Sequence, residues 1–505
     1  MRCGLTGDQS VRRYDAKDMR RLASSGGAVQ PQPASWLGTP VAAAMAVGFV
    51  VRALFLWRHP LFRGDALVYG ELAHHMIKEH VYGLVDAGVL KPTLIRLPGY
   101  PLFLAACFEV FGDGNYLSVL WVQLLVDLAS CGLIAGIVRR IAGRRAGMWA
   151  LWVAVLCPFT ANYAVVVVPE CVSIFFVALA FYGLVCWTEA WETHLRAQGT
   201  RAKMGHQHWW AALVGFALVA AVLLRPDQGL LAVAVVLAML WFVRRDGRRG
   251  WGVRLAPAVI ASAIVALPLS VWAVRNWRVF HVFQPIAPKY ANDPGEEVAY
   301  GFMRWYRTWA VGFPSTVKVY WRYDGDPISM NDLPARAFDS AQQRAETAQI
   351  VARYNEESAS TPHVDAEFAR LAEQRVRANP LRYYVELPVA RLFDMWFRPR
   401  IEYMKIPLDW WRLGAHLWGS VRAYAMGALN VAYLGLACVG FWRWRRAGVV
   451  LWSMMAFVAL RCALLLTIDN SEPRYTMECY PVVLMFAALA IAWWRHEDQS
   501  PVSGG

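Results

Sequence analysis

Residues 115–138 read NYLSVLWVQLLVDLASCGLIAGIV and are followed directly by Arg139 and Arg140. A helix needs roughly 20 mostly apolar residues to cross about 30 Å of hydrocarbon, and this stretch is long enough. Similar stretches recur along the 505-residue chain, which is 57% hydrophobic and contains 25 tryptophans. A soluble core of this length could not bury so much apolar surface, so the sequence predicts an all-α polytopic integral membrane protein.

Apolar runs of spanning length occur along most of the chain, and they predict about ten to twelve transmembrane helices. The third and fourth runs are nearly continuous, split by the Pro158 to Pro169 region, and the fifth and sixth are short. The runs cover approximately residues 37–57, 115–138, 146–162, 164–187, 209–224, 227–243, 252–274, 420–441, 448–468 and 476–494.

Arginine clusters occur in alternate loops between these runs, as the positive-inside rule requires. They lie within residues 12–21, 139–145, 244–249 and 443–446. We therefore expect a multi-pass protein of the inner (plasma) membrane with both termini in the cytoplasm. The first run has no small-residue cleavage site, which favours a retained span over a signal peptide. The net charge of +14 is explained by these topogenic clusters and does not indicate a partner nucleic acid.

This orientation divides the chain into five parts and places two long loops, 58–114 and 275–419, outside the cytoplasm. Chemistry is therefore expected on the outer face. The expected parts are a disordered cytoplasmic tail at 1–36, a membrane core at 37–274 that includes the first outer loop, an extracytoplasmic loop with interfacial helices at 275–419, C-terminal transmembrane helices at 420–494 and a cytoplasmic tail at 495–505.

The outer loops contain further helical patterns. An amphipathic helix around residues 68–78 is expected to lie in the membrane interface. Helices are also expected at about 334–357 and 365–378, before an amphipathic return at 383–397. His74, His75, Glu79 and His80 do not share one helix face, which favours a solvated surface over a metal site. A run of aromatic residues either contacts sugar or lies at the interface; it comprises Trp305, Tyr306, Trp309, Trp321 and Tyr323.

Short motifs follow one another in a characteristic order across residues 40–490. They are Gly64-Asp65, Arg96-Leu97-Pro98-Gly99-Tyr100-Pro101, Pro169-Glu170, Leu224-Arg225-Pro226, Arg275-Asn276-Trp277, Asn379-Pro380 with Arg391, and Glu472-Pro473-Arg474-Tyr475. In this order the chain resembles the C-type superfamily of membrane glycosyltransferases, and within it the family of protein O-mannosyltransferases and lipid A aminoarabinose transferases. The resemblance implies inverting transfer of a sugar from a polyprenyl phosphate to a hydroxyl acceptor on the outer face.

The resemblance also implies roles for two carboxylates. Asp65 matches the catalytic base at the start of the first outer loop, and Glu170 matches a second acid that orients the acceptor or binds a divalent cation. The family often has another acid directly after the base, where this chain has Ala66. Without the resemblance, Asp65 could be a helix N-cap and Glu170 a solvated loop residue. The metal ligands are not specified, and a divalent cation is the only cofactor considered.

Four residues are candidates for binding the substrate. Arg96, Arg225 and Arg275 lie on the outer side, where topology does not require positive charge, and a lipid-linked phosphate needs charge-assisted donors. One or two of them are expected to hold the leaving phosphate, while snorkelling is the alternative for Arg275. Tyr100 is the fourth candidate, because it lies in the Pro98-Gly99-Tyr100-Pro101 motif that carries the resemblance. Glu472 and Arg474 are expected to form a structural pair at the mouth of the last span.

The expected partners are a polyprenyl-phosphate sugar donor, the lipid bilayer and an acceptor that is a glycan, a lipid or a protein. A soluble nucleotide sugar is not expected, because the chain has no glycine-rich phosphate loop on a strand–helix unit. Two other functions are considered: a transporter of polyisoprenoids or lipid-linked saccharides, and a catalytically inactive homologue. A transporter would carry charges at mid-span and repeated halves, whereas the acids here concentrate on one face.

Overall fold

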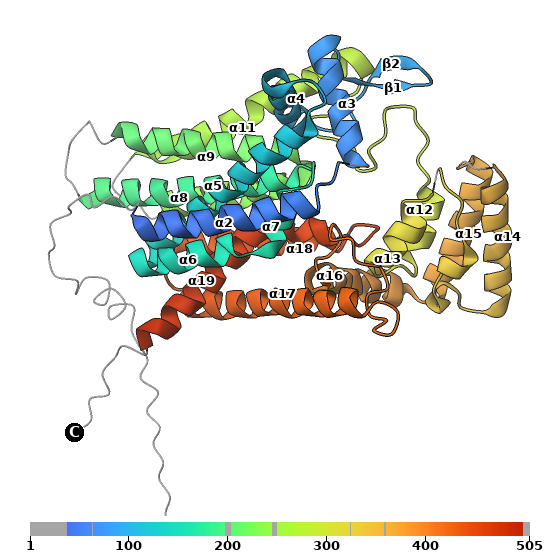
Figure 1. Cartoon of the computed structure of the whole chain (residues 1–505). Coiled ribbons are helices and arrows are strands. Elements are labelled where there is room, and N and C mark those ends of the chain that lie inside the picture. The colour runs from blue at the N-terminus through green and yellow to red at the C-terminus, as the bar shows by residue number, and fades with distance from the viewer. Residues whose placement is uncertain are drawn as a thin grey trace, which may run out of the picture.

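The computed structural model describes residues 38–62, 64–196, 204–244, 250–323, 325–357 and 360–497. These residues are almost entirely helical (Figure 1), which confirms the predicted all-α fold. They include eight helices long and apolar enough to cross a membrane, together with the shorter apolar helices α4 (Gly99–Phe111) and α18 (Val449–Leu465). The tail predicted at 1–36 and residues 498–505 of the second tail lie outside the described residues.

The long helices form one bundle and run roughly side by side (Figure 1). Its elements are α2 (Thr39–Arg58), α5 (Tyr116–Ala142), α6 (Arg144–Val155), α7 (Pro158–Tyr163), α8 (Glu170–Arg196), α9 (Met204–Leu224), α10 (Gly229–Arg244), α11 (Trp251–Phe280), α17 (Leu417–Trp444), α18 and α19 (Tyr480–Glu497).

The third and fourth predicted spans differ from the structure. The run at 146–162 divides into α6 and α7, because a proline inside a helix removes a hydrogen bond and clashes with the preceding turn. Pro158 accordingly begins α7, and the chain between α7 and α8 is non-helical up to Pro169. Helix α8 therefore begins at Glu170, six residues later than the predicted start of that span.

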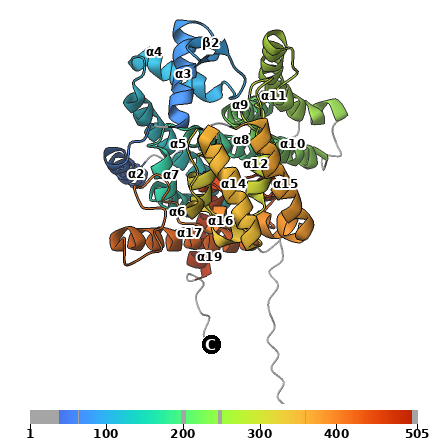
Figure 2. The same ribbon diagram turned by 90° about the vertical axis from the view of Figure 1, so that its right-hand side faces the viewer.

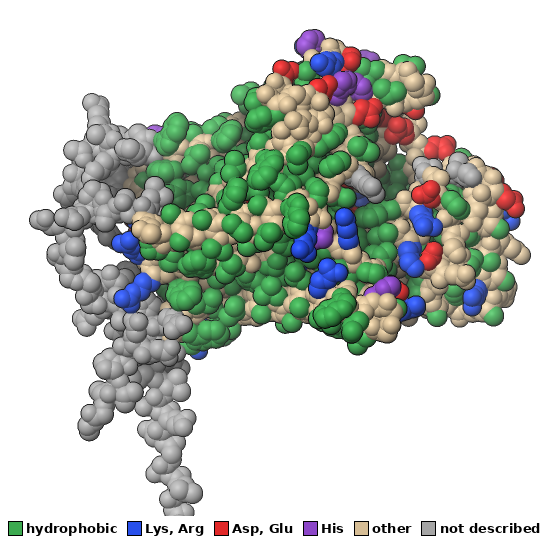
Figure 3. Space-filling view, in the orientation of Figure 1, with side chains coloured by type: hydrophobic (Ala, Val, Ile, Leu, Met, Phe, Trp, Pro, Cys, Tyr) green, Lys and Arg blue, Asp and Glu red, His purple; other side chains and the backbone are tan. Residues whose placement is uncertain are grey.

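The side of the bundle seen in Figure 3 is covered by hydrophobic side chains, and charged side chains gather at its ends. Large apolar residues such as Leu54, Trp57, Leu237 and Trp442 are exposed. Such a surface would be unfavourable in water and is what lipid tails solvate. The surface pattern therefore agrees with a membrane-embedded bundle.

A buried ion pair connects the first two long helices. Arg52 on α2 donates from Nε to Asp127 Oδ2 on α5 at 2.6 Å, and both side chains are almost completely inaccessible to solvent. The same guanidinium donates from Nη1 to the carbonyl oxygen of Val155 at 2.7 Å. Val155 ends α6, where a carbonyl has no partner within its own helix. Arg52 thus both neutralises Asp127 and satisfies the helix end that Pro158 creates.

Both long loops lie at the same end of the bundle, and Figure 2 looks onto this end. The first loop contains α3 (Asp65–Lys78), the antiparallel strands β1 (Gly83–Asp86) and β2 (Val89–Pro92), and α4. The hairpin has no counterpart in the sequence-based prediction. His75 is also buried, with its Nδ1 2.9 Å from the carbonyl oxygen of Gly83, so it does not belong to a solvated face.

The second loop contains α12 (Tyr300–Arg307), α13 (Phe313–Ser315), α14 (Ala341–Glu357), α15 (Pro362–Ala378) and α16 (Leu387–Phe397). The last three agree with the predicted helices. Trp305, Tyr306 and Trp309 are at most 1% exposed and pack against Phe368 and Leu371 in a local core. The prediction that these three aromatic residues stack against a sugar is therefore wrong. They stabilise the helices of the second long loop.

The orientation of the bundle in the membrane is a prediction that reporter fusions can test. Fusions after residues 90, 246 and 340 should report outside, inside and outside, because the arginine-rich loops are retained in the cytoplasm. A reporter that is active on one side only, such as alkaline phosphatase, gives the measurement. Any other pattern would contradict this orientation.

Candidate functional site

A short backbone contact brings the two predicted acids close together. Leu61 N donates to Val165 O at 3.2 Å, and Val167 N donates to Leu61 O at 3.1 Å. The segment that leads into α3 and the segment that leads into α8 are therefore paired. Asp65 and Glu170 begin these two helices. Two residues 105 positions apart in the sequence thus enter one site.

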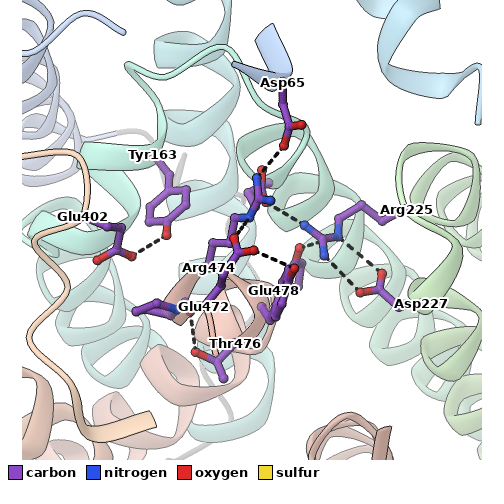
Figure 4. A network of polar contacts seen from close by, with 12 residues as sticks. Asp65, Tyr163, Arg225, Asp227, Glu402, Glu472, Arg474, Thr476 and Glu478 are labelled. Carbon is purple, nitrogen blue, oxygen red and sulfur yellow. Dashed lines mark hydrogen bonds and ion pairs between the residues drawn. The ribbon is translucent and has the colours of Figure 1, made fainter. Parts of the chain in front are cut away.

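Asp65 is held by arginines and does not act as the helix N-cap. The N-cap position is Gly64, whose φ of 60° lies in the left-handed region that favours glycine. The Asp65 carboxylate accepts a hydrogen bond from Arg474 Nη1 at 2.8 Å (Figure 4). It also accepts one from Arg96 Nη2 at 3.4 Å. Its side chain is 31% exposed. Burial opposes ionisation of Asp65, but the two guanidiniums outweigh it and lower its pKa.

Arg474 connects Asp65 to a second acid. Its Nε pairs with Glu472, as predicted, while its Nη1 faces Asp65. Glu472 also accepts hydrogen bonds from Asn470 and from the Tyr475 hydroxyl, both at 2.8 Å. The pair is therefore structural, but Arg474 is also part of the site, a role that the sequence-based prediction missed. The motif Glu472-Pro473-Arg474-Tyr475 was the signal that pointed to this segment.

Glu170 belongs to a buried network of acids and arginines. Its side chain is inaccessible to solvent, so the alternative of a solvated loop residue is wrong. Arg225 donates from Nη1 to Glu170 at 2.6 Å, and it also pairs with Asp227 at 3.2 Å and with Glu478 at 3.0 Å. Arg461 on α18 contacts the same Asp227 and Glu478. All three nitrogens of Arg225 thus already face carboxylates.

Another arginine fixes the segment that carries Arg474 and Glu478. Arg400 is fully buried and donates to Tyr480 Oη at 2.5 Å, Pro473 O at 2.8 Å and Thr476 Oγ1 at 2.6 Å. These contacts hold the short helical segment Pro473–Cys479 at both ends. Arg400 is therefore a positioning residue, since it orders the backbone from which Arg474 projects.

Two predicted substrate-binding residues contact protein groups in the structure. Tyr100 is fully buried, and its hydroxyl donates to Gln123 Oε1 at 2.6 Å; Gln123 in turn donates to Val166 O at 2.7 Å. Arg275 donates to the carbonyl oxygens of Thr93 and Tyr82 at 2.8 and 2.9 Å. Tyr100 thus supports the segment before Glu170, and Arg275 fastens the first outer loop to α11.

Gly99 explains why the Pro98-Gly99-Tyr100-Pro101 motif needs a glycine. A Cβ at this position would lie 2.5 Å from the carbonyl oxygen of Leu223 at the end of α9. This close approach of α4 to α9 brings the loop that carries Arg96 near the chain that carries Arg225. Any larger residue would separate the two helices.

Arg96 is the predicted arginine whose donors are most available to a ligand. Its hydrogen bonds to Ile95 O and Asp65 are long, at 3.3 and 3.4 Å, and its side chain is 27% exposed. Arg474 is 20% exposed and lies on the other side of Asp65. Two partly exposed guanidiniums can bind a phosphate, and the ionised carboxylate between them can accept a proton.

A divalent cation finds few ligands in this arrangement. Glu170 Oε2 is buried and has no hydrogen-bond partner. However, the described part of the chain contains no group of three His, Cys, Asp or Glu residues that could hold a metal ion. Because a site for a hard cation normally uses several oxygen ligands, the residues present do not fit a cation held by protein groups alone.

The family comparison matches part of the chain. Residues 91–272 match the model of the dolichyl-phosphate-mannose-protein mannosyltransferases. This range includes Arg96, Glu170 and Arg225, whereas Asp65 and Arg474 lie outside it. A search of curated proteins finds no match.

Solved structures give a longer match at low sequence identity. The Archaeoglobus fulgidus oligosaccharyltransferase tethered with an acceptor peptide superposes with a TM-score of 0.52 and 12% identity, over 91% of this chain and 49% of that chain. The archaeal oligosaccharyltransferase AglB from the same organism was solved in complex with an inhibitory peptide and a dolichol-phosphate. It superposes with a TM-score of 0.50 and 14% identity, over 92% of this chain and 52% of that chain. This chain spans about half the length of the archaeal enzyme that it matches.

A third structure is less similar. ArnT from Cupriavidus metallidurans bound to undecaprenyl phosphate gives a TM-score of 0.39 and 16% identity, over 90% of this chain and 76% of that chain.

The bundle and its two long loops thus share the fold of the archaeal oligosaccharyltransferase. In sequence, residues 91–272 resemble the dolichyl-phosphate-mannose-protein mannosyltransferases.

Proposed function

We propose that the chain is a membrane glycosyltransferase that moves a sugar from a polyprenyl-phosphate donor to a hydroxyl acceptor on the extracytoplasmic face, with inversion. The observation that carries this proposal is the partly exposed Asp65 carboxylate between Arg96 and Arg474. A phosphate at the arginines would have its lipid tail beside the apolar bundle. The matching family is named for a dolichyl-phosphate sugar, and AglB was solved with dolichol-phosphate, which supports a lipid-linked donor.

The proposed reaction is a single displacement. The acceptor oxygen attacks the anomeric carbon from the face opposite the phosphate, and a new carbon–oxygen bond forms as the bond to the phosphate oxygen breaks. The electron pair of that bond leaves with the phosphate, and Arg96 and Arg474 stabilise the developing negative charge. The proton of the acceptor hydroxyl passes to Asp65.

The lowered pKa of Asp65 fits this order of events. A carboxylate held by two guanidiniums stays ionised at neutral pH but is a weak base. It can take the proton only after the acceptor oxygen has bonded to the anomeric carbon and become acidic. Proton transfer is therefore late, as expected for an oxocarbenium-like transition state.

Glu170 has an assisting role in this proposal. Its Oε1 holds Arg225, and its unpartnered Oε2 is available to accept a hydrogen bond from the acceptor hydroxyl. No step of the proposed reaction uses a cation, because the described residues include no group of three ligands that could hold one. Arg225 keeps Glu170 in place and is a positioning residue.

The proposed function is tested by incubating the purified full-length chain with a panel of polyprenyl-phosphate sugars and a mixture of membrane acceptors. Release of free polyprenyl phosphate and transfer of labelled sugar should occur together with at least one donor. Binding of the donors without release would favour a transporter or an inactive homologue.

Arg96→Lys is expected to lower the transfer rate about tenfold or more, because lysine keeps the charge but loses the planar fork that binds phosphate. The measurement is kcat/KM for the polyprenyl-phosphate donor. Arg278→Lys is the matched control: this residue lies in the last turn of α11 at the same end of the bundle and is exposed. Equal rates for both variants would mean that Arg96 does not bind the donor phosphate.

A further inference from the structure

A second basic cluster lies away from Asp65, between the outer helices and the loop that follows α18. Arg391 on α16 is fully buried, and its Nη1 donates to the carbonyl oxygens of Ala310 at 3.0 Å and Arg307 at 3.3 Å. These contacts satisfy the carboxyl end of α12. Its Nε and Nη2 are also buried but have no hydrogen-bond partner. Unpaired charged donors in a buried position are costly, so a ligand or water must normally meet them.

The charges around Arg391 are predominantly positive. Arg307 lies 3.3 Å from Asp469 and Lys289 lies 3.9 Å from the same carboxylate. The nearby Asp394 carboxylate already accepts hydrogen bonds from the Ser471 hydroxyl and the Phe313 backbone amide, and it pairs with Arg398. Among the described residues, the ion-pair partner of Lys289 and Arg307 is Asp469, so three positive charges face one carboxylate, an excess of two.

The cluster can be reached from the solvent. The Lys289 side chain is 55% exposed and that of Arg307 is 23% exposed, while Arg391 is inaccessible behind them. Arg307 Nε is a further buried donor without a partner. Two of the three cations are therefore partly exposed to solvent, whereas the unpaired donors of Arg391 are buried.

One short segment joins this cluster to the Asp65 site. Asp469 lies at its start and Arg474 at its end, and Asn470 donates to Glu472, which pairs with Arg474. The two basic groups are therefore separate but share residues 469–474. A molecule that occupied both would place one end at the basic cluster and the other near Asp65.

We propose that Lys289, Arg307 and Arg391 bind a phosphate monoester carried by the acceptor, at a distance from the hydroxyl that is glycosylated. A phosphate monoester has a charge of about −1.5 to −2 at pH 7, which matches the excess positive charge. Its oxygens suit the paired Nε and Nη2 donors of an arginine. This inference rests on the proposed function, because it names the class of acceptor for the same site.

The test measures the binding of inorganic phosphate to the full-length protein in detergent, with the donor site saturated by polyprenyl phosphate. Arg307→Gln should weaken phosphate binding about tenfold, because a charge-assisted contact is lost. Asp469→Asn should tighten it, because the carboxylate that pairs with Lys289 and Arg307 is removed. Arg304→Gln is the matched control: Arg304 lies on the same helix but pairs with Glu373 on the outer surface.

Polyprenyl phosphate binding, measured in the same preparations, identifies the source of the phosphate. We expect Arg307→Gln to leave polyprenyl phosphate binding unchanged and Arg96→Gln to weaken it. Equal phosphate affinities in the wild type, Arg307→Gln and Asp469→Asn would overturn the proposal. Loss of polyprenyl phosphate binding in Arg307→Gln would overturn it too, since the cluster would then be the donor site. If the wild type binds inorganic phosphate at the cluster but releases no carrier from any donor, the proposed function fails while the anion site stands.

Discussion

Asp65→Asn is expected to lower the rate of sugar transfer by about 10² to 10⁴, the usual range for loss of an acid–base group. The amide keeps the size of the side chain and its oxygen can still accept from Arg474, so folding should be retained. The substitution should lower kcat, because the Asp65 carboxylate takes up the proton of the acceptor hydroxyl. Turnover and thermal unfolding are to be measured in the same preparations.

Glu170→Gln provides the comparison. It should also slow transfer, but less than Asp65→Asn if Glu170 only orients the acceptor. Its partner Arg225 retains Asp227 and Glu478, so the network should survive. An Asp65→Asn protein that both folds and transfers sugar normally would show that another group accepts the proton.

Arg52→Leu is expected to reduce the free energy of unfolding by about 3 to 5 kcal/mol, because Asp127 would remain as a buried charge without a partner. The double variant Arg52→Leu with Asp127→Leu should recover much of this loss, since both charges are then removed. Recovery should be incomplete, because Val155 O also loses its donor. Thermal or chemical unfolding in detergent gives the measurement.

An exposed ion pair serves as the control for this effect. Arg140 and Glu189 also join α5 to a neighbouring helix, but their side chains are 35% and 44% exposed. Removing Arg140 should therefore cost about 1 kcal/mol or less. Equal losses for Arg52→Leu and Arg140→Gln would contradict the role given to the buried pair.

Periodicity and length were sufficient to predict the bundle and the outer helices, because both depend on local sequence. The β-hairpin at 83–92 was not predicted, since its short strands carry little alternation. The sequence indicated a break between the third and fourth spans at Pro158 to Pro169, but not that it would divide the third run into two helices. The carbonyl left without a helical partner at the end of α6 is satisfied by Arg52 from a different helix.

For a similar reason, the sequence predicted which residues lie in the site but not which partners they contact. Asp65, Glu170, Arg96 and Arg225 were named from their motifs, and the structure brings them into one region. Whether a guanidinium is available depends on its partners in three dimensions, and the sequence does not specify them. Arg225 faces three acids and Arg275 faces backbone carbonyls, whereas Arg474 faces Asp65.

Buried partners were the hardest to predict. Arg461 and Glu478 lie inside apolar runs, where an ionisable residue is itself a signal of function or pairing. Arg461 pairs with Glu478 and also with Asp227 across the bundle. Spacing along the chain gives no indication of such contacts, because they join α18 to the short segments Pro226–Gln228 and Pro473–Cys479.

The location of the donor phosphate is the most direct test of the proposed site. An experimental structure of the full-length chain with bound polyprenyl phosphate would measure it. We expect the phosphate oxygens about 3 Å from the guanidiniums of Arg96 and Arg474, with the sugar-bearing side directed at Asp65. A phosphate bound at Lys289, Arg307 and Arg391 instead, or anywhere remote from Asp65, would contradict the account.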